Sequence, residues 1–182
     1  MRFRAIGGIY ILKEAIKKSW IWAVILAVGI IIGIVGYQFL IPIILPGIQQ
    51  TFEYIDKSAA TKNAFSKPFS LMIIIFLKNL SVALICFITA KLSRGFIPGF
   101  IMLINGIVIG MLGTLVSHSG MPVMSFVMGI LPHGIVELPA LFLACAIGMF
   151  GISQESWGIA RIPFLMLLVA AGIESYITPL VM

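Results

Sequence analysis

The sequence predicts an all-α integral membrane protein with about five transmembrane helices. Of its 182 residues, 61% are hydrophobic and 10% are charged, whereas a soluble domain is roughly half apolar and about a quarter charged. The mean hydropathy is +1.18, and several apolar runs reach the about 20 residues that one bilayer crossing needs. These values exclude a water-soluble globule and leave no room for a sizeable catalytic domain outside the membrane.

The N-terminal segment, residues 1–19, predicts an amphipathic helix at the membrane interface, and residues 20–182 predict one polytopic transmembrane domain. Basic side chains share the N-terminal segment with Ile9, Leu12 and Ile16, which recur at helical spacing. The predicted transmembrane helices cover residues 20–45, 68–90, 96–116, 135–152 and 162–181. A polar stretch over residues 47–67 has apolar residues at helical spacing, which predicts a short surface helix.

A further apolar run, residues 121–131, is too short to cross a bilayer and predicts a broken half-helix. Pro132, Gly134 and Pro139 follow it and are expected to break the chain before the next helix. Such a half-helix either re-enters the protein interior or lies flat on the membrane surface. The sequence leaves both alternatives open.

The distribution of basic residues predicts a plasma-membrane protein with a cytoplasmic N-terminus and an external C-terminus. In this orientation Lys57, Lys62 and Lys67 lie outside. The expected cytoplasmic residues are Arg2, Arg4, Lys13, Lys17, Lys18, Lys91, Arg94 and Arg161. The net charge of +6 therefore reflects orientation and contact with anionic lipid, and no nucleic-acid partner is expected.

Three predicted helices carry polar residues near their middle: Lys78, Asn79, Asn105 and Glu174. His133 and Glu137 lie at the start of the helix predicted over residues 135–152. An ionised group at that depth costs about 2.5–3.5 kcal/mol on insertion scales, so these side chains are expected to face the protein interior and pair. His133 and Glu137 share one helix face. Two interpretations stay open: a structural lock in which Lys78 and His133 neutralise the carboxylates, or an ion or proton site.

Small residues mark the expected helix-packing faces. The glycines on these faces are Gly95, Gly99, Gly106, Gly110, Gly113, Gly148 and Gly151. Cys86 and Cys145 lie within apolar runs and are expected to pack as small side chains. The abundance of small residues on several helices also indicates a homo-oligomer.

No motif in the sequence predicts an enzyme. The pair of His133 and Glu137 lacks the third ligand and the base of a metalloprotease, so no metal site is predicted, and no G-x-S-x-G nucleophile motif is present. No cofactor is expected either.

The run from Leu131 to Ala140, LPHGIVELPA, resembles the PHGxxELPA signature of the stage II sporulation protein M family (SpoIIM, DUF95). The resemblance extends to Asn79, to Asn105 with its following glycines, and to the residues before Glu174, and it covers residues 65–182 well. It implies a membrane protein of about five helices that acts as a scaffold for other membrane or cell-envelope proteins. The alternative from the residues alone is an ion or small-solute channel or transporter that uses the polar cluster as its pathway.

Overall fold

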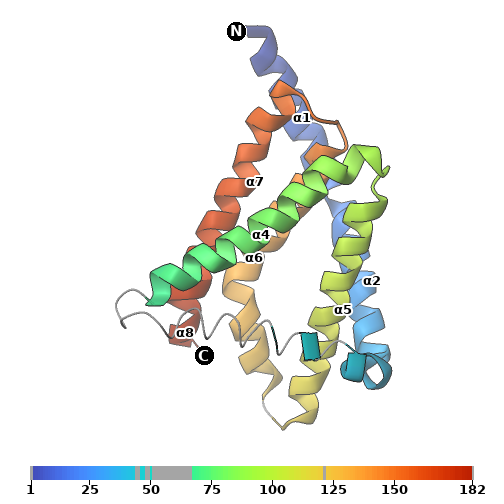
Figure 1. Ribbon diagram of the computed structural model, residues 1–182, viewed down its shortest axis with the longest axis vertical. Coiled ribbons are helices and arrows are strands. Elements are labelled where there is room, and N and C mark those ends of the chain that lie inside the picture. Colours follow the sequence, from blue (N-terminus) through green and yellow to red (C-terminus); the bar gives the residue numbers. More distant parts are fainter. Residues whose placement is uncertain (1, 44–45, 48–49, 51–66, 121, 182) are drawn as a thin grey trace.

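The computed structural model describes residues 2–43, 46–47, 50, 67–120 and 122–181 (Figure 1). Within these ranges the chain forms helices and turns and no strand, as the sequence predicts. The helices are α1 (Arg2–Lys18), α2 (Trp20–Val35), α4 (Lys67–Leu92), α5 (Phe96–His118), α6 (Val123–Gly148), α7 (Gln154–Gly172), the π-helical segment η1 (Ile173–Ile177) and α8 (Thr178–Val181). The surface helix predicted over residues 47–67 lies almost entirely outside the described residues.

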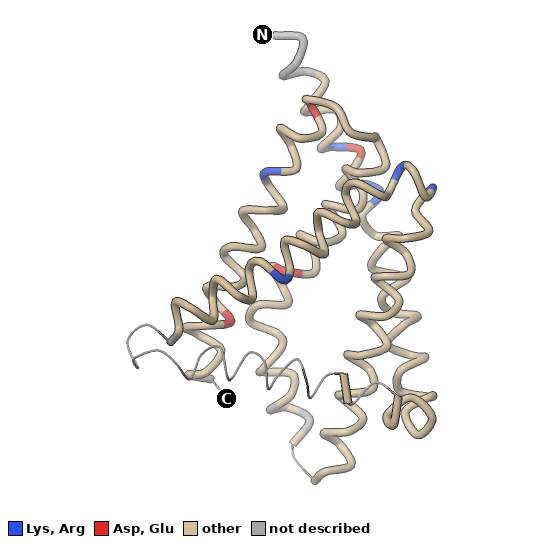
Figure 2. The backbone as a smooth tube through the Cα atoms, viewed as in Figure 1, with Lys and Arg blue, Asp and Glu red and all other residues tan. Residues whose placement is uncertain are grey.

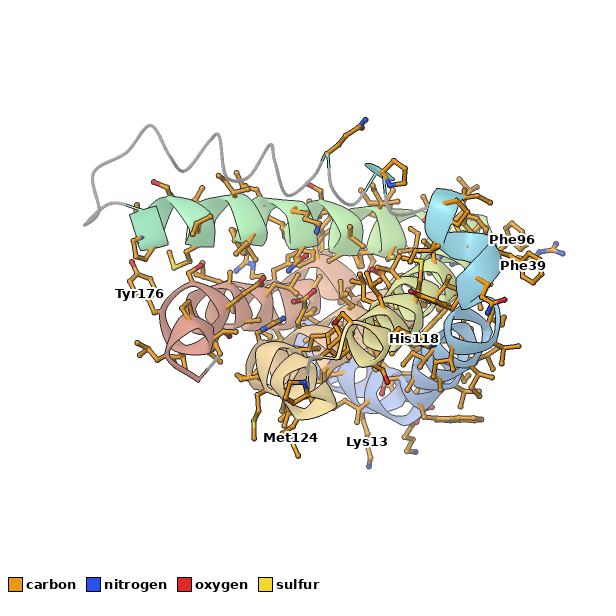
Figure 3. The ribbon with its side chains drawn as sticks, turned by 90° about the horizontal axis from the view of Figure 1, so that it is seen from below. Lys13, Phe39, Phe96, His118, Met124 and Tyr176 are labelled. Carbon is orange, nitrogen blue, oxygen red and sulfur yellow. The ribbon has the colours of Figure 1, made fainter. Side chains whose placement is uncertain are left out.

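Five helical stretches in the described part of the chain are long and apolar enough to cross a membrane, which confirms the predicted fold class. They cover Gly7–Val35, Pro68–Leu92, Phe96–His118, Phe126–Gly148 and Gln154–Leu180. Large apolar side chains point away from the bundle, as Phe39 and Phe96 do in Figure 3; these two are 79% and 77% exposed. An apolar exterior of this kind is stable in lipid and would aggregate in water.

The spans alternate in direction, so the two termini lie toward opposite ends of the molecule (Figure 1). α2 runs beside α5, and α6 contacts every other long helix of the bundle. α4 crosses α6 and α7 at an angle (Figure 1). The bundle therefore has two sides: a tight pair of α2 and α5, and a more open group of α4, α6 and α7.

Glycines allow the close approach of α2 and α5. A side chain at Gly106 would collide with the carbonyl oxygen of Leu26, and one at Gly110 would collide with that of Ile30. The contact is reciprocal, because Gly29 meets the backbone of α5 in the same way. Such contacts maximise dispersion and permit Cα–H···O interactions, which hold helices together where lipid removes the hydrophobic driving force.

Alanine and cysteine side chains form the contact between α4, α6 and α7. Cys86 of α4 and Cys145 of α6 are both buried and free, as the sequence predicts for packing residues. Gly148 lies against the backbone of Phe87, so a Cβ there would collide with the carbonyl oxygen of Phe87. Small residues thus bring α4 and α6 together near the ends of both helices.

Other glycines expected to be packing residues have different surroundings. Gly95 and Gly151 have φ values of +87° and +89° and form the turns after α4 and α6, where a side chain would be strained. A Cβ atom at Gly113 would lie 3.1 Å from the ring of Phe126, whereas one at Gly99 would make an ordinary contact with Ile25.

The prediction of a broken half-helix over residues 121–131 is wrong, because α6 continues through Pro132, Gly134 and Pro139. Each proline removes one backbone N–H donor. A break would leave several backbone groups unpaired in apolar surroundings, at a cost of several kcal/mol for each group. A continuous helix loses fewer hydrogen bonds than a broken one. α6 therefore includes most of the predicted half-helix and most of the helix predicted over residues 135–152.

The last span begins earlier than the predicted residue 162. The side-chain oxygen of Ser153 accepts a hydrogen bond from the backbone N–H of Ser156 at 3.1 Å and caps α7. Glu155 lies in the first turn, where the helix dipole favours an anion. This start places Arg161 within α7, although the sequence pattern predicts a loop there.

The predicted N-terminal helix is present as α1, and it packs against α7 and α6. Ala15 is fully buried in this contact. Ser19 keeps helical angles, φ −61° and ψ −27°, so α1 leads directly into α2 and the first candidate span starts at Gly7. The location of α1 at a membrane interface stays a prediction.

Candidate functional site: a polar cavity within the helix bundle

A cavity of about 290 Å³ lies between α4, α5, α6 and η1. All six residues of the predicted intramembrane polar set line it: Lys78, Asn79, Asn105, His133, Glu137 and Glu174. Isoleucine and leucine side chains complete the wall: Ile74, Ile75, Ile109, Leu112, Ile130, Leu138 and Leu141. The structure thus brings together side chains that the sequence relates only by their depth in separate helices.

Helix α6 supplies two potential ligands, His133 and Glu137, one turn apart on the face toward the cavity. Gly134, which was predicted to break the helix, lines the same cavity. Because glycine has no side chain, this part of the wall stays open. The predicted break is therefore absent, and one of its residues contributes space to the site.

The π-helical segment η1 supplies Glu174. A π-turn contains more residues than an α-turn, so it changes which side chains of the helix face a neighbouring helix. Such turns are rare in proteins, and those that occur are often found at functional sites. Neither helical periodicity nor a proline or glycine within residues 173–177 signals this turn in the sequence. The hydroxyl of Thr178 donates to the carbonyl oxygen of Ile173 at 3.4 Å, which closes the segment against α8.

His133, Glu137 and Glu174 converge on one point. One potential ligand atom from each lies within 4.8 Å of the other two. None of the three forms an ion pair within 4.0 Å with any described residue, so these side chains are close without being paired. Nδ1 of His133 is buried and has no hydrogen-bond partner among the described residues. The described residues therefore include no direct ion pair between His133 and Glu137, and the choice between a structural lock and an ion site stays a prediction.

Lys78 lines the cavity but is an exposed residue, and it makes no ion pair with either glutamate within 4.0 Å. Its charge nevertheless acts on the carboxyl group of Glu137, as do Glu174 and the side chain of Asn79. Asn79 is buried, with 9% of its surface exposed. Asn79 therefore faces the interior of the protein, whereas Lys78 lines the cavity and stays exposed.

Asn105 of α5 faces the cavity with its amide nitrogen already engaged. The side-chain NH₂ group donates to the carbonyl oxygen of Ile101 at 2.9 Å. The amide oxygen is then the atom of this side chain that can accept from, or ligate, a guest in the cavity. Asn105 therefore presents an acceptor to the site.

Two larger cavities lie elsewhere and lack this chemistry. One of about 380 Å³ is lined by Lys18, Trp22 and Arg94 near the α4–α5 turn, and it contains no acidic residue. Another of about 660 Å³ lies at the start of α7 around Ser153 and Arg161. Volume alone would favour these two, but the smaller cavity is the one of the three that joins carboxylates, an imidazole and amides inside the apolar spans.

The arrangement is suited to hold a small positively charged or polar guest. Carboxylate oxygens, an imidazole nitrogen and an amide oxygen are all electron-pair donors. Among the described residues, no nucleophilic Ser, Thr or Cys lines the cavity. The geometry thus provides binding groups.

Comparison with known proteins agrees with the resemblance seen in the sequence. The model of the family described as SpoIIM, Stage II sporulation protein M, matches residues 22–179. No curated protein and no solved structure matched the chain. The match includes all of the spans except the beginning of the first and the end of the last. The chain is a multi-pass membrane protein that belongs to the stage II sporulation protein M family.

Proposed function

We propose that the cavity between α4, α5, α6 and η1 binds a small cation on a pathway through the membrane. The observation that carries this proposal is the lining of one cavity by Glu137, Glu174, His133 and both asparagines. Ionisable residues within membrane spans are expensive, and they mark ion pathways and proton relays. The chain has only six acidic residues, and two of them, Glu137 and Glu174, line this cavity.

The unpaired state of the glutamates supports binding rather than structural support. A buried ion pair compensates its own charge and needs no guest. Within the described chain, neither Glu137 nor Glu174 has a cationic partner within 4.0 Å. A cation that enters the cavity supplies that compensation. The ammonium group of Lys78, which lines the same cavity, repels the cation and therefore weakens its binding.

Flux measurements in sealed vesicles test this proposal. Purified protein is reconstituted into liposomes that contain cation-sensitive dyes, and uptake of Na⁺, K⁺, Mn²⁺ and Zn²⁺ is followed. We expect wild-type vesicles to pass at least one of these ions and Glu137→Gln to reduce its flux at least about tenfold. Glu14→Gln is the matched control, because Glu14 lies outside the cavity and pairs with Lys17. Equal flux in wild type, variant and protein-free vesicles would contradict the proposal.

We also propose a second role as a membrane scaffold that forms homo-oligomers and holds other membrane or cell-envelope proteins. Family membership supports this role. The exposure of Lys78 in the middle of α4 supports it too, because a lysine facing lipid at that depth is unfavourable. A second copy or another protein over this face would shield the charge.

Light scattering of the detergent-solubilised protein tests the second role. We expect a defined oligomer for the wild type and dissociation for Lys78→Leu if the lysine contributes polar contacts to a partner. Pull-down from native membranes should recover a reproducible set of envelope proteins. A monodisperse wild-type monomer without co-purifying proteins would contradict the scaffold role.

We further propose that the N-terminus is cytoplasmic. Most Lys and Arg residues of the described chain lie toward the end of the molecule that carries the N-terminus (Figure 2). Basic residues near the ends of spans remain on the cytoplasmic side. Fusion of reporter enzymes to each terminus tests the orientation; activity of a cytoplasm-specific reporter at the C-terminus would contradict it.

A further inference from the structure

We propose that His133, Glu137 and Glu174 form a three-ligand site for a divalent first-row transition-metal ion, with Zn²⁺ and Mn²⁺ as the principal candidates. The inference deepens the proposed function, since it names the class of cation that the cavity takes. The sequence alone offers two ligands on one helix turn. The structure adds the third from η1, about forty residues further along the chain.

The spacing of the three side chains fits a single ion. One ligand atom of each lies within 4.8 Å of the others. Two ligands bound to one tetrahedral Zn²⁺ ion at about 2.0–2.2 Å lie about 3.3–3.6 Å apart. The three side chains therefore surround a space slightly larger than a bound ion requires and would move together when the ion binds. The side chains also form no direct hydrogen bond with one another, so they surround a space instead of closing it.

The donor atoms select the class of metal. One imidazole and two carboxylates form a mixed nitrogen and oxygen set, which suits Zn²⁺, Mn²⁺, Fe²⁺ and Co²⁺. Mg²⁺ and Ca²⁺ prefer sites made of oxygen alone. Neither Cys86 nor Cys145 lines the cavity, so the thiolate ligands that select Cu⁺ are missing from it.

Charge provides an independent argument. Two carboxylates within the apolar spans carry a combined charge of −2 when ionised, and no cation lies within 4.0 Å of either in the described chain. Uncompensated charges in a low-dielectric region are strongly unfavourable. Lys78 in the same cavity compensates part of this charge from a greater distance, and a divalent ion compensates the rest at the point where the carboxylates converge.

The buried Nδ1 atom of His133 provides the second independent observation. Nδ1 of His133 is shielded from solvent and has no hydrogen-bond partner in the described part of the chain. Buried polar side-chain atoms are nearly always paired, so an unpaired one requires an explanation. A histidine that binds a metal through one ring nitrogen commonly donates the N–H of its other ring nitrogen to a neighbouring acceptor, which fixes the orientation of the ring. The glutamates and Asn79 lie in the same cavity and offer such acceptors.

Three protein ligands leave a coordination position open. Structural zinc sites are closed by four protein ligands, whereas sites that exchange a ligand retain an open position. Asn105 lines the same cavity, and its amide oxygen is available because its NH₂ group is directed to Ile101. It can orient a molecule at the open position or replace it. This arrangement favours an ion that enters and leaves over one that is permanently held.

Metal binding by the purified full-length chain tests the inference. The protein is stripped with a chelator in detergent or nanodiscs and titrated with Co²⁺, whose visible absorption reports coordination number and nitrogen ligation. Zn²⁺ is then added as competitor. We expect one ion per chain and displacement of Co²⁺ by Zn²⁺. His133→Gln, Glu137→Gln and Glu174→Gln should each weaken binding by at least about tenfold to a hundredfold.

Two matched controls separate the site from adventitious binding. His118→Gln removes the other histidine of the chain, which hydrogen-bonds to Thr114 and stacks on Tyr37 outside the cavity. Glu14→Gln removes an acidic residue at the surface. Both should bind Co²⁺ as the wild type does. Equal weakening by the controls would overturn the inference.

The shift in melting temperature on addition of Zn²⁺ provides a second measurement of binding, which also applies to variants whose own stability is altered. Saturating Zn²⁺ should raise the melting temperature of the wild type and of His118→Gln, and should leave that of Glu137→Gln unchanged. A wild type that shows no saturable binding, or that binds Mg²⁺ more tightly than Zn²⁺, overturns the inference. Tight metal binding without flux into vesicles would overturn the proposed pathway and leave the metal site intact. Flux without saturable metal binding would overturn the metal site and leave the pathway intact.

Discussion

The two sides of the bundle use an equally apolar sequence in opposite ways. Between α2 and α5, Gly29, Gly106 and Gly110 bring the two backbones into contact. Between α4, α5, α6 and η1 lies a cavity of about 290 Å³ with polar walls. The contrast teaches that small residues close a helix contact within a membrane, and that larger polar residues keep one open.

The difference has an energetic meaning. Helices in lipid are held by dispersion and close backbone approach, so the α2–α5 contact stabilises the fold. The carboxylates and the imidazole on the other side cannot contribute in the same way, because they lose solvation without forming an ion pair within 4.0 Å among the described residues, and Nδ1 of His133 has no hydrogen-bond partner there. Native proteins tolerate such groups chiefly where they have a function. Stability and binding therefore depend on different contacts of the bundle, and α5 takes part in both.

The largest effect is expected from forcing the tight side apart. Gly110→Leu should destabilise the fold by at least about 3 kcal/mol, because its side chain collides with the backbone of Ile30 and the helices must separate. Thermal unfolding and size-exclusion profiles in detergent measure this. If Gly110→Leu melts like the wild type, the α2–α5 contact does not stabilise the protein as described.

Neutralising a cavity carboxylate should produce the opposite combination of effects. Glu174→Gln should reduce cation flux at least about tenfold while leaving the melting temperature equal or higher, because an ionised group within the spans costs about 2.5–3.5 kcal/mol. Flux and melting are measured on the same preparation. A variant that unfolds early but transports normally would mean that the cavity supports structure rather than passage.

The N-cap of α7 lies away from both the α2–α5 contact and the polar cavity. Ser153→Ala should cost about 1 kcal/mol, because the backbone N–H of Ser156 loses its acceptor. Faster hydrogen exchange at the start of α7 is the expected signature, with flux unchanged. Should exchange there remain slow, the start of α7 does not depend on this cap.

The smallest effect comes from a glycine with free space around it. No atom of the described chain would lie within 4 Å of a Cβ at Gly158, which is exposed in α7. Gly158→Ala should therefore stabilise the helix by about 0.5–1 kcal/mol. It is the matched opposite of Gly110→Leu. A loss of stability would show that this face of α7 has a partner that fills the space around Gly158.

Composition and periodicity were sufficient to predict the fold class, and the cost of exposing polar groups to lipid led to the prediction that the polar residues gather in the interior; the six residues do line one cavity, but no ion pair within 4.0 Å joins them in the described part of the chain. The path of α6 through Pro132 and Pro139 was not predictable from the local rule, because that rule treats proline as a helix terminator in water. The start of α7 was missed although Ser153 is a capping residue, since the polar residues after it resembled a loop.

The π-turn and the third ligand could not be predicted from the sequence. η1 depends on how the last span packs against its neighbours, and no spacing of residues in the region encodes it directly. Glu174 was placed at the right depth from its position in an apolar run, but its distance to His133 depends on the crossing of separate helices. Local patterns indicate depth and face; they do not fix which helices become neighbours.

The central claim is that Glu137, Glu174, His133 and the two asparagines share an accessible cavity and do not face lipid. Chemical modification of single cysteines in membrane-embedded protein tests it most directly, in a chain in which Cys86 and Cys145 are replaced by alanine. A small charged thiol reagent should modify Glu137→Cys and Glu174→Cys at least about tenfold faster than Leu165→Cys, whose position is 61% exposed on the apolar exterior. Equal rates at all three positions, or no modification at either cavity position, would contradict the account.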